Sequence, residues 1–416
     1  MSTENPRTRP GRPLDGVVVV DLTTFLSGPF ASQILVDLGA DVIKVEPPGG
    51  DSSRHIPPHF VDGDSAYYLS HNAGKRSICL DLKTPSGLEI LRKLIGTADV
   101  VLENFRPGVS TRLGIDPANM TADHPRLVWA SISGFGQTGP RSHLPAYDMI
   151  VQALSGVMSL TGEPDRPPVR LGIPGGDLIA GMYAVIGLLA SLADVRRGQH
   201  GRIIDISMLD SMLSMLSYQA SYTLLSGVAP PPQAARHDSI PTYRSFQGSD
   251  GKQFVITANT EAMWVAMCRA AGVAELLDDD RYSSPSKRLA NKTSLWCRLE
   301  ARFAEHSAEH WVTLLTGTNV PAALVKSVPE ALADARDSER YILRRTHDPV
   351  RGTFESVGSP IMFVGAERNE QAFPPRLGQD GEAILRAIGY ADDDIERLVQ
   401  DRIVLLDIDD RVPGRS

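Results

Sequence analysis

Gly175-Gly176-Asp177 is the segment whose residue types most directly suggest chemistry. An apolar run follows it, predicted to be a helix over residues 178–196. Asp is a favoured N-cap residue, so a simple helix cap is one interpretation of Asp177. Two features suggest more, because the glycines allow a close approach to the carboxylate and the helix dipole favours its ionised form. An ionised carboxylate can act as a nucleophile, which makes Asp177 a candidate catalytic residue.

Cations near the ends of predicted strands form a second group of candidates. Residues 103–108 (ENFRPG) follow a predicted strand and combine an amide, an aromatic ring and a cation. Ligands of open α/β sheets bind beyond the carboxyl ends of the strands, so these side chains could hold a base and its phosphates. Solvated surface charge is the alternative interpretation. The cations concerned are Lys75, Arg76, Lys83, Arg106 and Arg112.

Two further motif matches are interpreted structurally. Residues 134–139 (GFGQTG) match the dinucleotide fingerprint, but Pro140 follows where a helix should open, so a glycine-rich loop is predicted. His306 and His310 match the HxxEH spacing of one metallopeptidase class. Ser307 is predicted to be an N-cap that starts a new helix and separates the two histidines. Zinc needs both histidines on one helical face and a third ligand, so we expect no metal site.

The elements that must position these residues alternate between short β-branched runs and helical segments. Strands are predicted at 17–22, 41–46, 77–82, 99–103, 126–133 and 202–206, and helices at 29–38, 85–95, 149–160, 178–196 and 208–225. This alternation is typical of an α/β protein with a parallel sheet covered by helices.

A proline-rich segment at residues 227–241 has the composition of a linker. Beyond it we expect a smaller unit with a hairpin that turns at residues 249–251. Helices are predicted at 261–271, 286–304, 308–316 and 381–388, and strands at 352–357 and 361–364. The predicted organisation is a first part of a large domain at 14–226, a small domain at 227–328 and a return segment at 329–416.

Composition excludes several classes of protein. The 416 residues are 42% hydrophobic and 22% charged, which excludes a mainly disordered, coiled-coil or collagen-like chain. The formal net charge is −8 and no domain-wide basic stripe is evident, so duplex nucleic acid is not an expected partner. Three cysteines lie far apart, without the spacing of a disulfide framework or a zinc site, and this fits a reducing compartment.

No targeting segment is predicted. Residues 1–13 are polar and lack the apolar core of a secretory signal, so we expect a flexible tail. The longest apolar run, residues 178–193, is shorter than the ~20 residues of a spanning helix. We therefore expect a buried core helix, no membrane partner and a cytoplasmic protein.

Together these segments resemble the class III coenzyme A transferases, the family of formyl-CoA transferase and carnitine CoA-transferase, which also includes the α-methylacyl-CoA racemases. The matching stretches run in order along almost the whole chain. They are PLDG at 13–16, SGP at 27–29, LGADVIKVE at 38–46, NAGKRSICLDLK at 72–83, ENFRPG at 103–108, SGFGQTGP at 133–140, AYD at 146–148, GD at 176–177, GQHG at 198–201 and LGQ at 377–379.

The resemblance implies a Rossmann-like large domain built from both chain ends and a smaller domain from the middle, in an interlocked homodimer. It also implies coenzyme A as co-substrate, with no metal. The family's nucleophilic aspartate falls on Asp177, and the acidic residue that assists it falls on Asp148, beside Tyr147. N–H groups at the start of the Asp177 helix could bind the developing oxyanions. The implied coenzyme A contacts are Leu26, Ser27, Leu80, Lys83, Asn104, Phe105, Arg106 and Arg112.

Departures from the family pattern bear on the substrate. Leu26 replaces a glutamine of the formyl-CoA transferases, and their GGGG loop is absent, which argues against oxalate and formate. Pro47 and Pro145 replace an arginine and a lysine that hold the nucleotide part in those enzymes. The racemases have a catalytic histidine at the position of Tyr147, and a phenol of reference pKa about 10 is a poor base at neutral pH.

The resemblance implies transfer of coenzyme A through a covalent aspartyl intermediate. Likeness of the GFGQTGP and TGEPD segments to one branch suggests that succinyl-CoA donates to a small dicarboxylate. An acyl-CoA racemase or isomerase on the same fold and a non-catalytic acyl-CoA-binding protein are the alternatives.

Overall fold

The computed structural model describes residues 11–364 and 370–407, so most of the predicted N-terminal tail lies outside the described residues. The chain divides into two compact units. Unit 1 comprises Met1–Val157, Arg170–Ser221 and Arg340–Ser416, and unit 2 comprises Met158–Val169 and Tyr222–Glu339. The predicted domains at 14–226, 227–328 and 329–416 remain predictions about folding units.

Unit 1 is built on a seven-stranded sheet with the order β14-β5-β2-β1-β6-β7-β8. The strands from β5 to β8 pair in parallel, and β14 runs antiparallel to β5. The predicted parallel sheet is confirmed. The strands are β1 (Val18–Asp21), β2 (Asp41–Glu46), β5 (Arg76–Leu80), β6 (Val100–Glu103), β7 (Val128–Ser133), β8 (Ile203–Ser207) and β14 (Val404–Leu405).

Strand order reverses between β1 and β6. The chain runs outward from β1 through β2 to β5 and then returns to β6 on the other side of β1. In open α/β sheets the loops diverge at such a point and leave a crevice beyond the carboxyl ends of the strands. The turns after β1 and β6 are therefore where the topology favours a ligand site.

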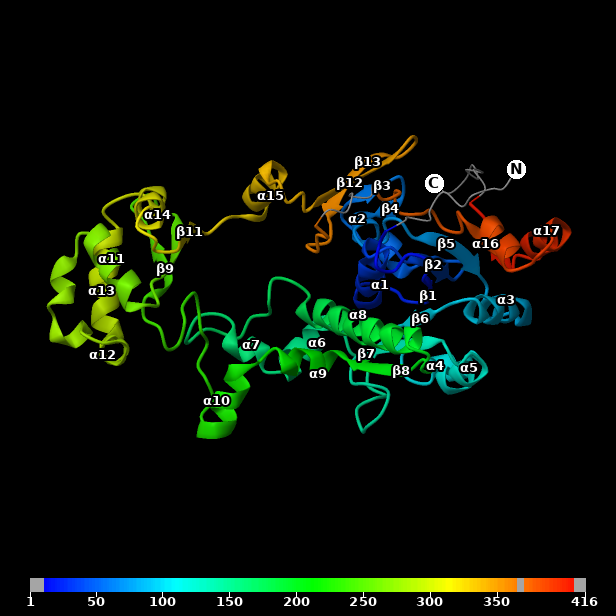
Figure 1. Ribbon diagram of the computed structural model, residues 1–416, viewed down its shortest axis with the longest axis horizontal. Helices are drawn as coiled ribbons and strands as arrows, with labels where there is room; N and C mark the ends of the chain where they lie inside the picture. Colours follow the sequence, from blue (N-terminus) through cyan, green and yellow to red (C-terminus); the bar gives the residue numbers. More distant parts are fainter. Residues whose placement is uncertain (1–10, 365–369, 408–416) are drawn as a thin grey trace. The chain divides into compact units, whose positions relative to one another are not determined.

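Helices cover both faces of this sheet (Figure 1). Successive strand residues point to opposite faces, so Val19 of β1 joins one apolar core and Val20 the other. The first core contains residues of α1 (Ser27–Asp37), α6 (Asp148–Leu154), α8 (Gly175–Arg196) and α9 (Met208–Ser214). The second contains residues of α3 (Pro85–Gly96), α5 (Pro117–Asp123), α16 (Gly381–Ala387) and α17 (Asp392–Gln400).

Helices α1 and α8 approach one another closely at Gly181. A Cβ atom there would lie 2.7 Å from the backbone oxygen of Ser27. Helix α8 begins three residues before the predicted start and is long and apolar enough to cross a membrane by length and composition. The core helix of a soluble protein passes the same test. Ala180, Ala184 and Leu188 are fully buried, as predicted for a core helix.

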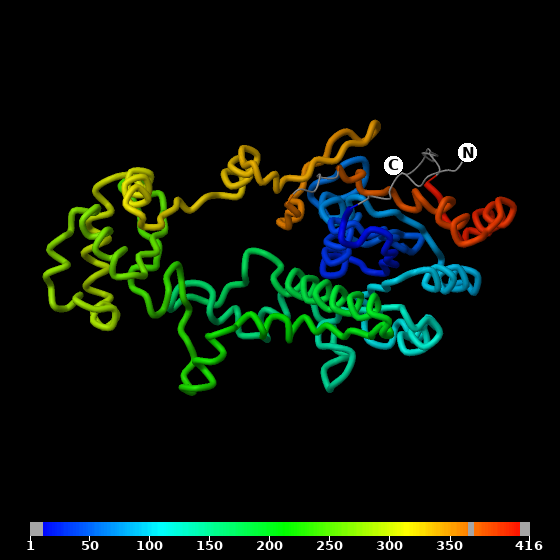
Figure 2. The backbone as a smooth tube through the Cα atoms, viewed as in Figure 1, coloured from blue at the N-terminus to red at the C-terminus, as the bar shows by residue number. Residues whose placement is uncertain are grey.

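The chain returns to unit 1 after residue 340, and Figure 2 shows this orange and red segment beside the blue N-terminal part. Strand β14 adds to the sheet edge at Leu80, and α17 buries Ile395. Sequence patterning missed both, because β14 has only two residues and α17 begins with three aspartates.

Smaller elements of unit 1 link the main ones. They are η1 (Ser52–His55), β3 (Phe60–Val61), β4 (Asp64–Ser65), α2 (Ala66–Leu69), α4 (Val109–Arg112), and the hairpin β12 (Leu343–Asp348) and β13 (Gly352–Val357). The predicted strand at 361–364 is absent, and these residues form no regular structure.

Three predicted helices are each divided in two. The 149–160 segment forms α6 and α7 (Val157–Leu160), separated at Gly156, which has φ 84°. The 208–225 segment forms α9 and α10 (Tyr218–Ser226), separated at Ser217, which has φ 48°. The 286–304 segment forms α12 (Pro285–Ala290) and α13 (Lys292–Phe303). A positive φ ends an α-helix, and apolar periodicity does not reveal it.

Unit 2 contains the predicted hairpin, β9 (Tyr243–Gln247) and β10 (Gln253–Thr257), extended by β11 (Ala322–Leu324). Its core includes edge-to-face contacts of Phe303 with Phe246, Phe254 and Trp311. Its other elements are α11 (Glu261–Ala270), η2 (Ala274–Leu277), η3 (Asp280–Tyr282), α14 (Ala308–Thr316) and α15 (Val328–Asp337).

Candidate active site

Asp177 is the third residue of α8 and not its N-cap. The N-cap is Pro174, and no side chain caps this helix by hydrogen bonding from that position. The interpretation of Asp177 as a helix cap is therefore wrong. Its carboxylate instead lies in the wall of a cavity in unit 1.

The start of α8 is held by Asp148, the first residue of α6. Asp148 Oδ1 accepts a hydrogen bond of 2.7 Å from the Gly176 N–H, and Oδ2 accepts one of 2.7 Å from Gln152 Nε2. Gly176 is required here, because a Cβ atom would lie 2.5 Å from Val151 Cγ2. The glycine thus makes room for α6 and not for a ligand, contrary to our expectation.

Two of the N–H groups that were expected to bind an oxyanion have hydrogen-bond partners within the chain. The Gly175 N–H donates to the Ile173 carbonyl at 2.8 Å, and the Gly176 N–H donates to Asp148. Neither of these two N–H groups is available to an oxyanion in this structure. Asp148 thus positions the helix start.

Burial raises the pKa of Asp177 to about 7, and the nearby negative charge of Asp148 adds to the rise. A hydrogen bond from Ser27 lowers the pKa and offsets only part of it. The helix dipole was expected to favour the ionised form, and burial and the like charge of Asp148 act in the opposite direction. A partly buried carboxylate with a perturbed pKa in a cavity wall marks a candidate functional site.

The cavity has a volume of about 190 Å³ and lies at the point where strand order reverses. Its wall includes turns that follow the carboxyl ends of β1, β6 and β7. The lining residues are Thr24, Phe25, Ser27, Asn104, Phe105, Arg106, Pro107, Ile132, Ser133, Gly134, Ser142, Leu144, Ala146, Tyr147, Asp177 and Met208.

Six of the predicted site residues share this wall: Ser27, Asn104, Phe105, Arg106, Tyr147 and Asp177. The chain brings them together from four regions, which supports their selection as a set. Their individual roles in binding and catalysis remain predictions.

The other predicted contacts with coenzyme A lie outside the wall. Leu26 is buried at the start of α1, and Leu80 is fully buried in the core. Lys83 and Arg112 are exposed, after β5 and at the end of α4. Leu80 is 0% exposed, whereas both cations are accessible to phosphate.

Asn104 has a structural task in the wall. Its Oδ1 accepts a 2.9 Å hydrogen bond from the Thr24 N–H, and its Nδ2 donates a 2.8 Å bond to the Thr24 carbonyl. Glu103, directly before it, is 1% exposed and accepts from the Phe105 N–H at 2.6 Å. These bonds fix the turns after β1 and β6 against each other.

Tyr67 does not line the cavity, but its ionisation is coupled to that of Asp177, which sequence reasoning did not anticipate. Burial raises its pKa to about 12, and the negative charges of Asp177, Asp51 and Asp148 contribute. Its hydroxyl therefore stays protonated within electrostatic reach of Asp177. It lies in the short helix α2, and no spacing motif marks it.

The glycine-rich motif at 134–139 and the HxxEH motif at 306–310 were interpreted structurally from the sequence. Residues 134–139 form turns, and the Gln137 N–H donates to both oxygens of Asp205, so the predicted glycine-rich loop is confirmed. Ser307 caps α14 as predicted. The rings of His306 and His310 nevertheless lie 4.4 Å apart, so the predicted separation of the histidines is wrong. Within residues 11–364 and 370–407 no group of three metal-ligating side chains occurs.

A larger cavity of about 500 Å³ lies elsewhere in unit 1. It contains none of the predicted site residues. Its charged groups include Asp37 and Arg344, which pair with each other at 2.6 Å. Volume alone therefore does not locate the site.

A mostly parallel α/β sheet with a perturbed carboxylate at its topological switch point is typical of ligand-binding proteins of the Rossmann-like class. The sequence model of CoA-transferase family III matches residues 14–381. The chain belongs to this family and is a CoA-transferase.

Known proteins of similar sequence and structure cover almost all of the chain. An acetyl-CoA:oxalate CoA-transferase of Acetobacter aceti is 38% identical over 92% of this chain and 97% of its own length. A succinyl-CoA:glutarate CoA-transferase of Mus musculus is 35% identical over 93% of this chain and 89% of its own. The crystal structure of a CAIB/BAIF family protein from Brucella suis matches with a TM-score of 0.80 at 36% identity, over 91% of this chain and 99% of that one.

Proposed function

We propose that this enzyme transfers coenzyme A from succinyl-CoA to a small dicarboxylic acid through a covalent intermediate on Asp177. The carrying observation is the Asp177 carboxylate, which lines the cavity with a pKa raised by burial and by Asp148. Relatives named for succinyl-CoA with glutarate, and for oxalate as acceptor, support a dicarboxylate. The oxalate relative weakens the sequence argument against oxalate, so oxalate belongs among the acceptors to be tested.

The chemistry proceeds through four exchanges of acyl bonds. Asp177 attacks the donor thioester carbonyl, the C–S bond breaks, and a mixed anhydride and coenzyme A thiolate form. The thiolate attacks the aspartyl carbonyl, which releases the donor carboxylate and leaves an aspartyl-CoA thioester. The acceptor carboxylate attacks this thioester, giving a new anhydride and thiolate. Attack of the thiolate on the acceptor acyl carbonyl yields the product and frees Asp177.

The protein's task in this scheme is to exclude water and to position the reacting groups. The cavity is smaller than the ~300–1,000 Å³ of pockets that enclose drug-sized ligands, so within unit 1 it fits the reactive end of the thioester. We assign the coenzyme to the exposed cations Lys83, Arg106 and Arg112, which can neutralise its phosphates.

We further propose a cytoplasmic homodimer. Exposed apolar side chains gather on helices of unit 1, including Met149 and Ile150 on α6 and Met182 and Ile186 on α8. Ile186 is 60% exposed, and clustered apolar exposure of this kind marks interaction surfaces. Sedimentation equilibrium giving the mass of one chain would contradict the dimer.

Replacement of Asp177 tests the central step. Asp177→Asn cannot form the anhydride, so transfer should fall by at least about a thousandfold. Asp210→Asn is a matched control, because Asp210 is also the third residue of its helix but is exposed and outside the cavity. It should keep full activity.

Trapping completes the test. Wild-type enzyme incubated with succinyl-CoA and then borohydride should carry a reduced aspartyl group on the peptide that contains Asp177, identified by mass spectrometry. An unmodified peptide together with an active Asp177→Asn variant would refute the covalent mechanism. Enzyme-dependent α-deuteration of the donor in heavy water would support the racemase alternative.

A further inference from the structure

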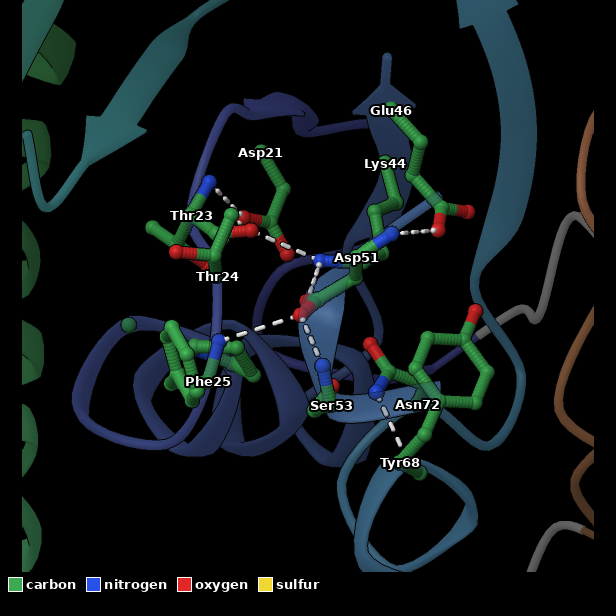
Figure 3. A network of polar contacts seen from close by, with 12 residues as sticks. Asp21, Thr23, Thr24, Phe25, Lys44, Glu46, Asp51, Ser53, Tyr68 and Asn72 are labelled. Atoms are coloured by element: carbon green, nitrogen blue, oxygen red, sulfur yellow. Dashed lines mark hydrogen bonds and ion pairs between the residues drawn. The ribbon is translucent and has the colours of Figure 1, made fainter. Parts of the chain in front are cut away.

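Residues 23–25 form the turn after β1, and the main chain of each of them is hydrogen bonded to a side chain from elsewhere in the sequence. Lys44 Nζ donates to the Thr23 carbonyl at 2.7 Å, and Asn104 pairs with the main chain of Thr24. Asp51 Oδ1 accepts from the Phe25 N–H at 3.2 Å, as Figure 3 shows. Thr24 and Phe25 both line the cavity that contains Asp177.

Phe25 has an unfavourable backbone conformation. Its φ of 62° lies in the left-handed region, which a bulky residue rarely adopts unless its surroundings impose it. This conformation sets the direction of the Phe25 ring, whose centroid lies 6.4 Å from that of Tyr147, edge to face. The ring pair forms part of the cavity wall, so the conformation of Phe25 determines the shape of the site.

Asp51 is itself rigidly held. Its Oδ2 pairs with Lys44 Nζ at 2.9 Å, and both side chains are 0% exposed. Its Oδ1 also accepts from the Ser53 N–H at 2.9 Å, and its own N–H donates to Glu46 Oε2 at 3.0 Å. The carboxylate thus has fixed partners on the side away from Phe25.

A second buried ion pair lies behind the same turn. Lys75 Nζ and Asp21 Oδ2 are 3.1 Å apart, also with both side chains 0% exposed. Asp21 Oδ1 accepts from the N–H of Thr23 at 2.9 Å, which Figure 3 shows beside Asp51. Buried ion pairs can often be replaced by apolar residues without loss of stability. Stability alone therefore does not account for two of them at one turn, whereas a need to fix the turn does.

We propose that Asp51 is a positioning residue, which holds Phe25 in its left-handed conformation and thereby sets the wall of the cavity around Asp177. The assignment rests on the proposed function, since it takes this cavity as the place of reaction. Asp51 touches no reacting atom in this scheme. It acts through the main chain of Phe25.

A double-mutant cycle separates positioning from a general structural effect. Asp51→Asn should lower kcat/KM by about tenfold to a hundredfold, because small displacements in a site have effects of that order. Glycine adopts positive φ without cost, so in a Phe25→Gly background the same substitution should lower kcat/KM less than about threefold. Equal losses in the two backgrounds would overturn the proposal.

Asp37→Asn is the matched control. Asp37 pairs with Arg344 in a buried ion pair, with side chains 8% and 9% exposed, but it does not line the cavity around Asp177. Its replacement should lower stability and leave kcat/KM within about twofold of wild type, as expected for sites without shared partners. If Asp51→Asn has no larger effect on kcat/KM than Asp37→Asn, the proposal is wrong.

A binding measurement and a replacement variant cover the cases in which the first variants cannot be assayed. Calorimetric binding of coenzyme A to the same four variants reports the coupling where Phe25→Gly turns over too slowly, and absence of coupling there overturns the proposal. If Asp51→Asn does not fold, Asp51→Glu, which keeps a negative charge beside Lys44 but displaces the oxygen that the Phe25 N–H contacts, replaces it in the cycle. An active Asp177→Asn variant would refute the proposed function, whereas an inactive one with no Asp51–Phe25 coupling would refute only the positioning role.

Discussion

Two pairs of aspartates differ in their surroundings: Asp21 and Asp51 are buried, whereas Asp177 and Asp148 are partly buried. Asp21 and Asp51 contact the ammonium groups of Lys75 and Lys44. For Asp177 the nearby charge is another carboxylate, Asp148. The lysine partners distinguish Asp21 and Asp51, to which we assign structural roles, from Asp177, for which we propose a chemical role.

The pKa directions follow from this difference. Burial by itself raises the pKa of each of these carboxyl groups. For Asp21 and Asp51 the lysine charges and hydrogen bonds outweigh burial and bring the pKa below its usual value. For Asp177, Asp148 adds to the effect of burial, and the pKa rises to about 7. A carboxylate stabilised by a cation is a poor nucleophile, whereas one without such a partner retains its reactivity.

Loss of an aspartate that pairs with a buried lysine should lower stability more than loss of an aspartate in an exposed ion pair. Asp21→Asn leaves the Lys75 ammonium buried without its counter-ion, which should lower the free energy of unfolding by about 3–5 kcal/mol. Urea unfolding followed by circular dichroism measures this change. Asp194→Asn removes the exposed pair with Arg202 and should cost no more than about 1 kcal/mol. Similar losses in the free energy of unfolding for the two variants would contradict the structural role assigned to the buried Asp21–Lys75 pair.

Activity should depend on the ionisation of Asp177. With a pKa of about 7, kcat/KM should rise about tenfold per pH unit from pH 5 to pH 7 and then level off, because the ionised form is the nucleophile. Steady-state rates from pH 5 to pH 9 test this. Asp148→Asn removes the like charge and should move the inflection to lower pH. A profile that is flat below pH 7 would contradict the raised pKa.

The smallest expected effect is a pH-dependent stability difference. The folded-state pKa of Asp177 exceeds its unfolded value, so its stabilising contribution is complete below the unfolded pKa of about 4. This contribution is lost as the pH rises through 7. Asparagine does not titrate, so Asp177→Asn should gain on wild type by several degrees in Tm between pH 5 and pH 8, on the order expected for about 2–3 kcal/mol. A Tm difference independent of pH would speak against the shift.

Local patterning predicted much of unit 1. The limits of β2 matched at both ends, and α3 and β7 matched to within two residues. The alternation of strands and helices was sufficient for the parallel sheet, because side-chain periodicity reflects burial on one face or both. The breaks at Gly156 and Ser217 were missed, since a single residue of positive φ leaves no periodic trace.

The candidate site was predicted only in part. Asp177 stood out because two glycines precede it at a predicted helix start, and the resemblance to a family supplied its neighbours in the wall. Tyr67 and the clamp formed by Asp51 were missed. The Phe25–Asp51 hydrogen bond joins residues 26 positions apart and the electrostatic interaction of Tyr67 with Asp177 joins residues 110 positions apart, so no local pattern encodes either one.

The sequence by itself determined the order and type of the main elements and the family, and it singled out Asp177 as the candidate carboxylate, because each depends on local composition or on motifs in order. Only the tertiary structure decided which aspartates meet a lysine and which meet another aspartate. The physical reason is that a pKa depends on burial and on charges a few ångströms away. Folding brings these together from α6, α8 and the strands, and so makes Asp177 chemically distinct from Asp51.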